Sequence, residues 1–275
     1  MANIFYISSW GGTATHWLAK SLDSHPELIC YHGRRTWPQY PACHAQSEEE
    51  LPHSQVRDPM DFANDMKAQA EQGQVVGSIH GYHGLAMATP VRALGGRFAA
   101  STRHPVLRTA SLHRHHYAKL LDDNNPGQIA SLNFFKNYAQ SQAGIIQNIV
   151  TQTGIDFGLS ELIYLWVSTG TVGFDLECNK LNPKYIFKME EYTKDKDYYK
   201  EMFCFLTQNK VSCDDAYLDA VFTRGKTNVH RTKDSSAENE FSSWPESHRA
   251  LFTTLFTDHR ETYASMGYDI EFAFC

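Results

Sequence analysis

Residues 97–111 constrain the fold strongly, because a β-prone run is followed at once by the start of a helix. The run ends in small residues, and Arg103-His104-Pro105 comes directly after it. Proline suits the first turn of a helix because its missing N–H has no partner there in any case. The planar arginine fork matches a phosphate, and Ser111 lies two helical turns further along. The segment therefore predicts a phosphate clamp at the carboxyl edge of a sheet.

The first residues of the chain form a second segment of the same kind. Ile4–Ser8 is a short apolar run, typical of a buried parallel strand. A turn of small residues that includes Gly11 and Gly12 then leads into a helix. This order presents backbone N–H groups and the positive end of a helix to an anion. Two glycines alone are a weak signal, and a plain tight turn before a helix is the alternative interpretation.

The remaining pattern predicts an α/β fold with a central parallel sheet flanked by helices. The apolar stripe within the long helical stretch 128–170 is expected to be core. Its members are Leu162, Ile163, Leu165, Trp166 and Val167. Strands are expected at 3–8, 28–31, 75–79, 97–102 and 185–189, and further helices at 15–24 and 60–72.

We expect residues 1–275 to form one domain, because no linker or internal repeat divides the sequence. Residues 33–60 contain four prolines and an acidic run, which predicts an irregular, lid-like insertion. The polar segment at about 224–245 predicts a flap.

Composition argues against several classes of partner. The chain has 25 lysines and arginines against 31 acidic residues, and a net charge of −6 argues against nucleic acid. It has no run of about 18 apolar residues and no basic and apolar leader. We therefore expect a cytoplasmic protein with no membrane partner. Six dispersed cysteines without a Cys-x-x-Cys motif fit reduced thiols.

Fourteen histidines require that a metal site be considered. His113 and His116 could share one face of a helix, in the densest cluster. No carboxylate or thiol stands at a matching spacing, and Arg114 between them opposes a bound cation. We expect no metal.

The two candidate phosphate-binding segments together resemble those of the sulfotransferases that use 3′-phosphoadenosine 5′-phosphosulfate (PAPS). The family's first motif reads Tyr-Pro-Lys-Ser-Gly-Thr-Thr-Trp-Leu, and residues 10–18 align with it, followed by Ser24-His25-Pro26-Glu27 at the family's distance. The second motif is Arg-Asn-Pro with a serine eight residues after the arginine, matched by Arg103, Pro105 and Ser111. Residues 185–192, 199–206 and 261–269 resemble later family segments in the correct order.

This resemblance implies a P-loop NTPase-like fold and transfer of a sulfuryl group from PAPS to a hydroxyl or amine of a small-molecule or glycan acceptor. It implies that the first loop holds the 5′-phosphosulfate, through Gly11, Gly12, Thr13, Ala14, Thr15 and His16. It implies that Arg103 and Ser111 hold the 3′-phosphate and that Trp17 stacks on adenine. Arg224-Gly225-Lys226 resembles, with its last two residues exchanged, the family's Arg-Lys-Gly loop over that phosphate.

The resemblance also implies a general base. The family's third strand ends in Lys-Thr-His, and Ser78-Ile79-His80 retains the histidine. An imidazole has an ordinary pKa of about 6.5 and can accept a proton from an attacking hydroxyl. His80 is therefore the predicted catalytic residue, and His83 in the same loop is the alternative.

The first loop differs from the family's motif at the position of the lysine that stabilises charge on the leaving phosphate oxygen. The family's loop lysine corresponds to Gly12, its glycine to Ala14 and a threonine to His16. Without a cation on the leaving phosphate oxygen, sulfuryl transfer loses electrostatic stabilisation. His16, His230 and Arg231 are the candidate replacements.

Two alternative functions stay open. One is a catalytically degenerate nucleotide-binding protein of the same fold. The other is a nucleotide-dependent phosphotransferase, which is less favoured because Gly-x-x-x-x-Gly-Lys-Ser/Thr is absent from the sequence.

Overall fold

The computed structural model describes residues 3–32, 58–79, 84–124, 127–223 and 236–275. The chain divides into two compact units, one formed by residues 1–103 with 180–228 and the other by residues 104–179 with 229–275. We call these unit 1 and unit 2. The prediction of a single domain stays a prediction.

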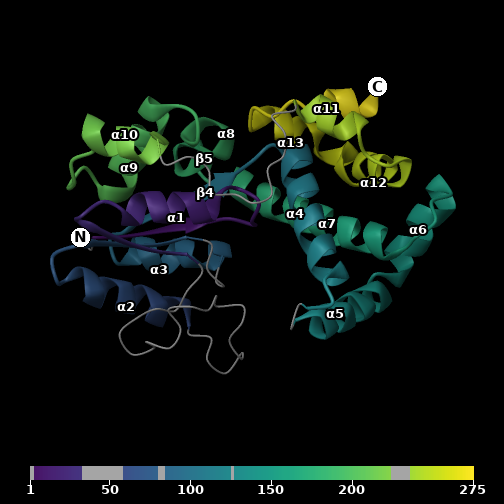
Figure 1. Cartoon of the computed structure of the whole chain (residues 1–275), viewed down its shortest axis with the longest axis horizontal. Helices are drawn as coiled ribbons and strands as arrows, with labels where there is room; N and C mark the ends of the chain where they lie inside the picture. Colours follow the sequence, from purple (N-terminus) through teal and green to yellow (C-terminus); the bar gives the residue numbers. More distant parts are fainter. Residues whose placement is uncertain (1–2, 33–57, 80–83, 125–126, 224–235) are drawn as a thin grey trace. The chain divides into compact units, whose positions relative to one another are not determined.

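Unit 1 contains a parallel sheet of five strands in the order β2-β3-β1-β4-β5. Figure 1 labels β4 and β5 of this sheet. From β1 the chain runs to one side of the sheet for β2 and β3, and then crosses to the other side for β4 and β5. The direction in which the chain connects its strands therefore reverses between β1 and β4. The predicted central parallel sheet is confirmed. Its strands are β1 Ile4–Ser8, β2 Leu28–His32, β3 Val75–Ile79, β4 Arg97–Thr102 and β5 Ile186–Lys188.

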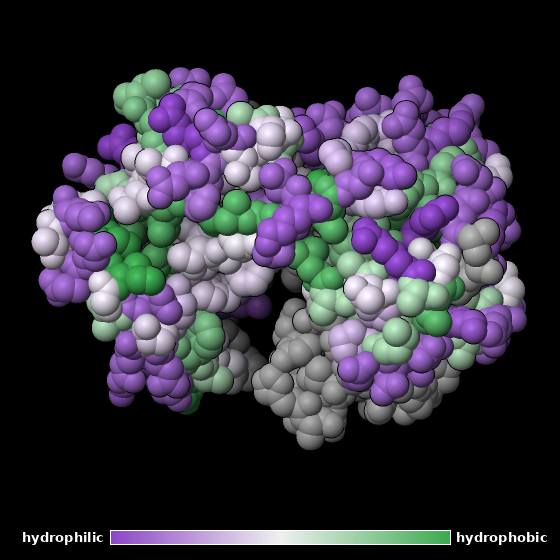
Figure 2. Space-filling model, turned by 180° about the vertical axis from the view of Figure 1, so that it is seen from behind, coloured by the Kyte–Doolittle hydropathy of each residue, from purple (hydrophilic) through white to green (hydrophobic). Residues whose placement is uncertain are grey.

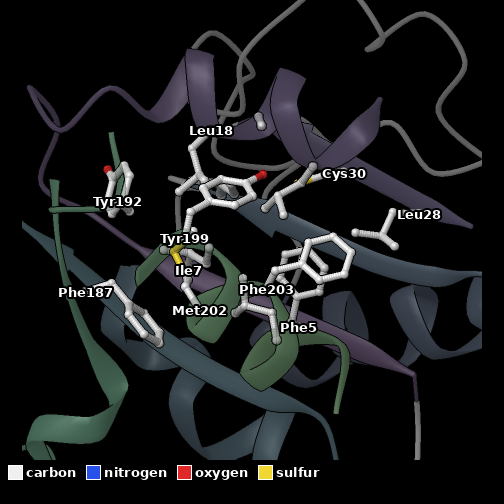
Figure 3. Packing of buried hydrophobic residues seen from close by; sticks show 14 of the residues in the cluster. Phe5, Ile7, Leu18, Leu28, Cys30, Phe187, Tyr192, Tyr199, Met202 and Phe203 are labelled. Atoms are coloured by element: carbon white, nitrogen blue, oxygen red, sulfur yellow. The ribbon is translucent and has the colours of Figure 1, made fainter. Parts of the chain in front are cut away.

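Helices cover both faces of this sheet because successive side chains of its buried central strand point to opposite faces. Phe5 and Ile7 of β1 belong to one hydrophobic cluster with residues of α1 and α9, part of which is seen in Figure 3. Ile4 and Tyr6 belong to another, with residues of α2 and α3. The helices are α1 Thr15–Asp23, α2 Pro59–Ala70, α3 Ala88–Ala93, α8 Met189–Tyr192, α9 Lys196–Thr207 and α10 Asp215–Thr223, with short 3₁₀ turns at Gly84–Met87 and Pro183–Tyr185.

Gly77 is required in β3 by the close approach of a ring from the neighbouring strand. A Cβ atom built at Gly77 would lie 1.9 Å from Cζ of Phe5. The two residues are register partners in β3 and β1. A side chain at position 77 would therefore displace Phe5 from the core.

Unit 2 consists of helices in its described part. Its core joins α4, α6, α7 and the C-terminal helices, with Tyr164, Leu251, Phe252 and Phe256 fully or nearly fully buried. The elements are α4 Pro105–Leu121, α5 Gln128–Ser141, α6 Ala143–Thr153, α7 Leu159–Asn179, α11 Ala237–Ser242, α12 Glu246–Phe256 and α13 Arg260–Ser265, with 3₁₀ turns at Thr257–His259 and Glu271–Phe274.

The predicted helical stretch 128–170 contains α5, α6 and the first part of α7. Gly154 ends α6 in the left-handed conformation, with φ 70°, and an irregular segment precedes α7. Of the predicted apolar stripe, Leu162, Ile163, Leu165 and Val167 are buried in α7, whereas Trp166 is partly exposed.

A fully buried ion pair connects α4 to α7. Arg108 Nη1 donates to Asp175 Oδ1 at 2.6 Å, and the two side chains are 0% and 1% exposed. The Tyr263 hydroxyl donates to the other carboxylate oxygen at 3.1 Å. Burial by itself lowers the pKa of Arg108, but the charge of Asp175 opposes this and the net pKa lies above its ordinary value. Arg108 therefore carries its positive charge at neutral pH.

Most of the predicted lid and part of the predicted flap fall on residues 33–57 and 224–235, which lie outside the described residues. Helix α11 forms within the last part of the expected flap, and the flap itself stays a prediction. Ser236 caps that helix by accepting from the N–H of Asn239. No helix among the described residues is long and apolar enough to cross a bilayer. On the face seen in Figure 2, hydrophilic residues predominate and hydrophobic ones gather in smaller groups.

The predicted histidine cluster on α4 lies partly in the interior of unit 2. His113 Nε2 is 3.1 Å from Ser160 Oγ, and the ring of His116 packs edge-on against Trp166. Burial lowers the pKa of His113 to about 4, and the charge of His248 adds to this effect. Burial also lowers the pKa of His116 to about 4, followed by the charge of His115. The described residues contain no group of three or more His, Cys, Asp or Glu that could hold a metal.

Acid is expected to destabilise unit 2 through these two histidines. Their unfolded pKa is about 6.5, so between pH 6.5 and 4 the unfolded chain binds protons that the folded chain does not. The free energy of unfolding should fall with decreasing pH through this window, by up to about 1.4 kcal/mol per pH unit for each histidine. Urea titrations between pH 6.5 and 5 measure this slope.

The double variant His113→Gln/His116→Gln should flatten that slope, and His259→Gln is the matched control. An unchanged slope in the double variant would contradict the assignment.

Candidate anion-binding site

The carboxyl ends of β1 and β4 define the candidate site. They are hydrogen-bonded neighbours, and the connections that follow them run to opposite sides of the sheet. In open α/β sheets, ligands bind outside the carboxyl ends of the strands at such a switch point. Residues 9–14 follow β1, and Arg103 follows β4 directly. Topology therefore places the two predicted phosphate-binding segments at the same edge.

The loop between β1 and α1 has an unusual backbone. Gly11 and Gly12 have φ of 108° and 64°, and Ala14 has φ of 52°. Glycine adopts such values readily, but for alanine the left-handed region costs about 1–2 kcal/mol. Two hydroxyls close the loop from within, since Ser9 Oγ lies 2.5 Å from Thr13 Oγ1 and accepts from the Gly11 N–H at 3.0 Å.

The start of α1 offers N–H groups to a ligand. Its N-cap residue is Ala14, whose methyl side chain cannot accept a hydrogen bond from the first turn. No acidic residue stands in that turn either. The first N–H groups of an α-helix have no partner within the helix and carry partial positive charge. This helix end therefore suits an anion.

Arg103 joins the two segments directly. Its Nη1 donates to the Gly12 carbonyl at 2.8 Å, although the two residues are 91 positions apart. The guanidinium side chain is 9% exposed, and its Nε lies 4.0 Å from Glu190 Oε1. Glu190 thus helps to hold Arg103 beside the loop. Although the loop has no lysine at position 12, the Arg103 guanidinium lies against its backbone.

A buried tyrosine is hydrogen-bonded to the loop between β1 and α1. The Tyr192 hydroxyl donates to the Thr13 carbonyl, and it lies 2.9 Å from Ser101 Oγ of β4. Burial raises the pKa of Tyr192, so its hydroxyl keeps its proton and remains a donor. Sequence reasoning assigned Tyr192 only to a family-like segment and gave no role to Ser101 or Glu190. These three residues could have been selected because each lies at or near the carboxyl end of β4 or β5.

A pair of histidines lies at the start of α1. The rings of His16 and His32 stack with centroids 3.6 Å apart, and His32 Nε2 is 2.9 Å from Thr15 Oγ1. His16 is exposed. Sequence analysis identified His16 alone. His32 is the last residue of β2, and it reaches His16 only because the sheet places the end of β2 beside the start of α1.

Trp17 packs differently from the expectation for an adenine-stacking residue. It is 3% exposed, its ring lies parallel to Tyr192 at 6.3 Å, and Tyr199 and Phe222 meet it edge-on. An adenine ring would have to displace part of this packing. The stacking role stays a prediction.

The other predicted site residues are not brought together by the described structure. Ser111 lies on α4 in unit 2, whereas Arg103 belongs to unit 1, so their joint role in 3′-phosphate binding stays a prediction. His80, His83, Arg224, Gly225 and Lys226 lie outside the described residues, as do His230 and Arg231. The described cysteines are free, and Cys43 is outside the described part.

Comparison with known proteins gave matches at the level of structure only. No family model matches the chain, and no curated protein matches it. A sulfotransferase from Alicyclobacillus acidocaldarius superposes with a TM-score of 0.42 and 14% identity, covering 100% of this chain and 99% of that one. The mouse sulfotransferase SULT7A1, in complex with PAP, superposes with a TM-score of 0.48 and 13% identity, covering 96% of this chain and 86% of that one. Both of these proteins are named as sulfotransferases.

Proposed function

We propose that this chain is a sulfotransferase that moves a sulfuryl group from PAPS to a hydroxyl or amine of a small-molecule or glycan acceptor. The observation that carries the proposal is the contact between Arg103 and Gly12. Two segments selected for phosphate binding, far apart in sequence, meet at the switch point of a parallel sheet. The absence of Gly-x-x-x-x-Gly-Lys-Ser/Thr from the sequence makes a phosphotransferase the weaker alternative.

In the proposed reaction the acceptor oxygen or nitrogen attacks sulfur in line with the bond to the phosphate oxygen. The new bond to sulfur forms as the bond to that oxygen breaks, which leaves a sulfated acceptor and 3′-phosphoadenosine 5′-phosphate (PAP). His80 takes the proton of the acceptor. Backbone N–H groups of the loop and the α1 N-terminus stabilise the charge that develops on the phosphate oxygen.

Arg103 and His16 are two described basic side chains at this edge of the sheet. Arg103 is held against the loop backbone at Gly12, and His16 lies in the first turn of α1. In the proposed enzyme Arg103 binds phosphate, and His16 with its stacked neighbour His32 supplies a donor where the family has lysine.

Nucleotide discrimination tests the binding half of the proposal. We expect PAP to bind at least about tenfold more tightly than 5′-ADP, because charge-assisted hydrogen bonds to the 3′-phosphate contribute roughly 1.5–3 kcal/mol each. Arg103→Ala should remove most of this difference while the fold is retained. Isothermal titration calorimetry of the parent and the variant measures both affinities.

Arg97→Ala is the matched control, because Arg97 begins the same strand at the opposite edge of the sheet. It should keep the preference for PAP. Equal affinity of the parent for PAP and 5′-ADP would exclude PAPS as the donor.

The second candidate function is a nucleotide-binding protein without transferase activity. It is favoured by Gly12 and by Ser78, which stand where the family has lysines, and Ser78 is fully buried in β3. A sulfuryl-transfer assay separates the two functions. If the parent is active, Gly12→Lys should add little and His16→Ala should slow transfer without weakening PAP binding. Activity that appears only in Gly12→Lys would assign the chain to the second function.

A further inference from the structure

The Tyr192 hydroxyl connects a strand of the sheet to the backbone of the loop between β1 and α1. It donates to the Thr13 carbonyl and lies 2.9 Å from Ser101 Oγ of β4. A carbonyl oxygen can only accept, so the single hydroxyl proton of Tyr192 is committed to Thr13. Ser101 must therefore donate to Tyr192. The result is a chain of two hydrogen bonds with a fixed direction, and it ends on the loop.

Burial keeps this chain of hydrogen bonds intact. Thr13, Ser101 and Tyr192 are each 0% exposed. Burial also raises the pKa of Tyr192 above its ordinary value, so the hydroxyl keeps its proton at neutral pH. A buried carbonyl that loses its donor carries the full cost of an unpaired polar group. The Thr13 carbonyl is therefore held facing Tyr192.

The direction of this carbonyl fixes the direction of the next N–H group. The peptide bond between Thr13 and Ala14 is trans, since the described residues contain no cis peptide bond. In a trans peptide the C=O and the following N–H point in opposite directions. The Ala14 N–H therefore points away from Tyr192. Arg103 Nη1 fixes the preceding peptide in the same way, because it donates to the Gly12 carbonyl at 2.8 Å.

This orientation is held against backbone strain at Ala14. Ala14 has φ 52° and ψ 30°, in the left-handed region that alanine adopts unfavourably. Rotation of the peptide plane between Thr13 and Ala14 by half a turn would bring φ of Ala14 to a negative value and relieve the strain. The same rotation would point the Thr13 carbonyl to the side where the Ala14 N–H now lies. Strained conformations of this kind persist only where their surroundings hold them.

We propose that Tyr192 is a positioning residue of the anion site, whose hydroxyl keeps the Ala14 N–H, rather than the Thr13 carbonyl, directed at the bound phosphate group. This inference rests on the proposed function, which gives the loop a phosphate to bind. Tyr192 acts through the loop backbone and not by contact with the ligand. Donors that are oriented before binding raise affinity, because no rearrangement is then needed when the anion arrives.

Tyr192→Phe isolates the effect of the hydroxyl, because it retains the ring that packs parallel to Trp17 at 6.3 Å. We expect this variant to bind PAP, and separately inorganic pyrophosphate, at least about tenfold more weakly than the parent. Isothermal titration calorimetry on the full chain measures both affinities. Pyrophosphate has no nucleoside, so its affinity reports on phosphate binding alone.

Tyr199→Phe is the matched control. Tyr199 is also 0% exposed, belongs to the same hydrophobic cluster seen in Figure 3, and meets Trp17 edge-on at 5.9 Å. Its hydroxyl, however, is paired with that of Tyr217 on α10, at 2.9 Å. The two variants should lose similar amounts of thermal stability, whereas only Tyr192→Phe should lose affinity for PAP and pyrophosphate.

A second substitution tests the orientation of the peptide itself. Ala14→Gly removes the penalty of the left-handed conformation, because glycine adopts positive φ readily. Added to Tyr192→Phe, it should strengthen pyrophosphate binding by at least about threefold, since the outward N–H orientation then costs less. A merely structural role of Tyr192 predicts no such recovery.

Affinities of Tyr192→Phe that match those of Tyr199→Phe would overturn the proposal. A double variant that binds pyrophosphate no more tightly than Tyr192→Phe would overturn it as well. The proposed function fails separately, if the parent binds pyrophosphate but not PAP. The order of the variants toward pyrophosphate would then still decide the role of Tyr192. A parent that binds neither ligand would overturn both.

Discussion

Replacing His80 by alanine is expected to reduce the rate of sulfuryl transfer by on the order of 10²–10⁴ while PAP affinity barely changes. His80 is the next residue after β3, and β3 lies beside β1, whose loop is the proposed phosphate site. A base at this edge would remove the acceptor proton as the bond to sulfur forms. Steady-state kinetics for transfer and calorimetry for PAP binding measure the two quantities separately.

His83→Ala is the matched control, because it removes the same side chain from the same segment. It should leave transfer close to the parent rate. A parent-like rate in His80→Ala together with a large loss in His83→Ala would move the role to His83. Loss of PAP affinity in His80→Ala would indicate a binding role rather than a catalytic one.

Replacing Asp175 by alanine is expected to lower the free energy of unfolding of unit 2 by about 3–5 kcal/mol. The change would leave Arg108 charged, fully buried and without its 2.6 Å partner, and would also remove the acceptor of the Tyr263 hydroxyl. Guanidinium titration followed by circular dichroism measures the loss.

Two further variants sharpen this test. Asp219→Ala removes the partner of Lys196 in a pair whose side chains are 67 and 50% exposed, so its effect should stay within about 1 kcal/mol. The double variant Arg108→Met/Asp175→Leu replaces both charges by apolar groups and should be more stable than Asp175→Ala. An Asp175→Ala protein as stable as the parent would contradict the proposed importance of the pair.

Local sequence patterns were sufficient to predict the strands of unit 1 and several of its helices. The strands at 75–79 and 97–102 have the predicted bounds, and the others differ by one residue at one end or at both ends. These elements follow from short apolar runs and from capping residues, such as the Asp58 carboxylate that accepts from the N–H of Met60 at the start of α2. The helical stretch at 128–170 was also predicted, but the division at Gly154, which ends α6, was not.

Neighbouring residues are enough to specify that a glycine turn and an arginine each follow a buried parallel strand. Which groups surround the turn and the arginine depends on how distant parts of the chain pack together. The strand order placed Arg103 against Gly12, Tyr192 beneath Thr13 and His32 beside Thr15, and it enclosed Trp17 among aromatic rings. Such contacts join residues as many as 179 positions apart. They depend on the order in which strands pair, which no local run of residues specifies.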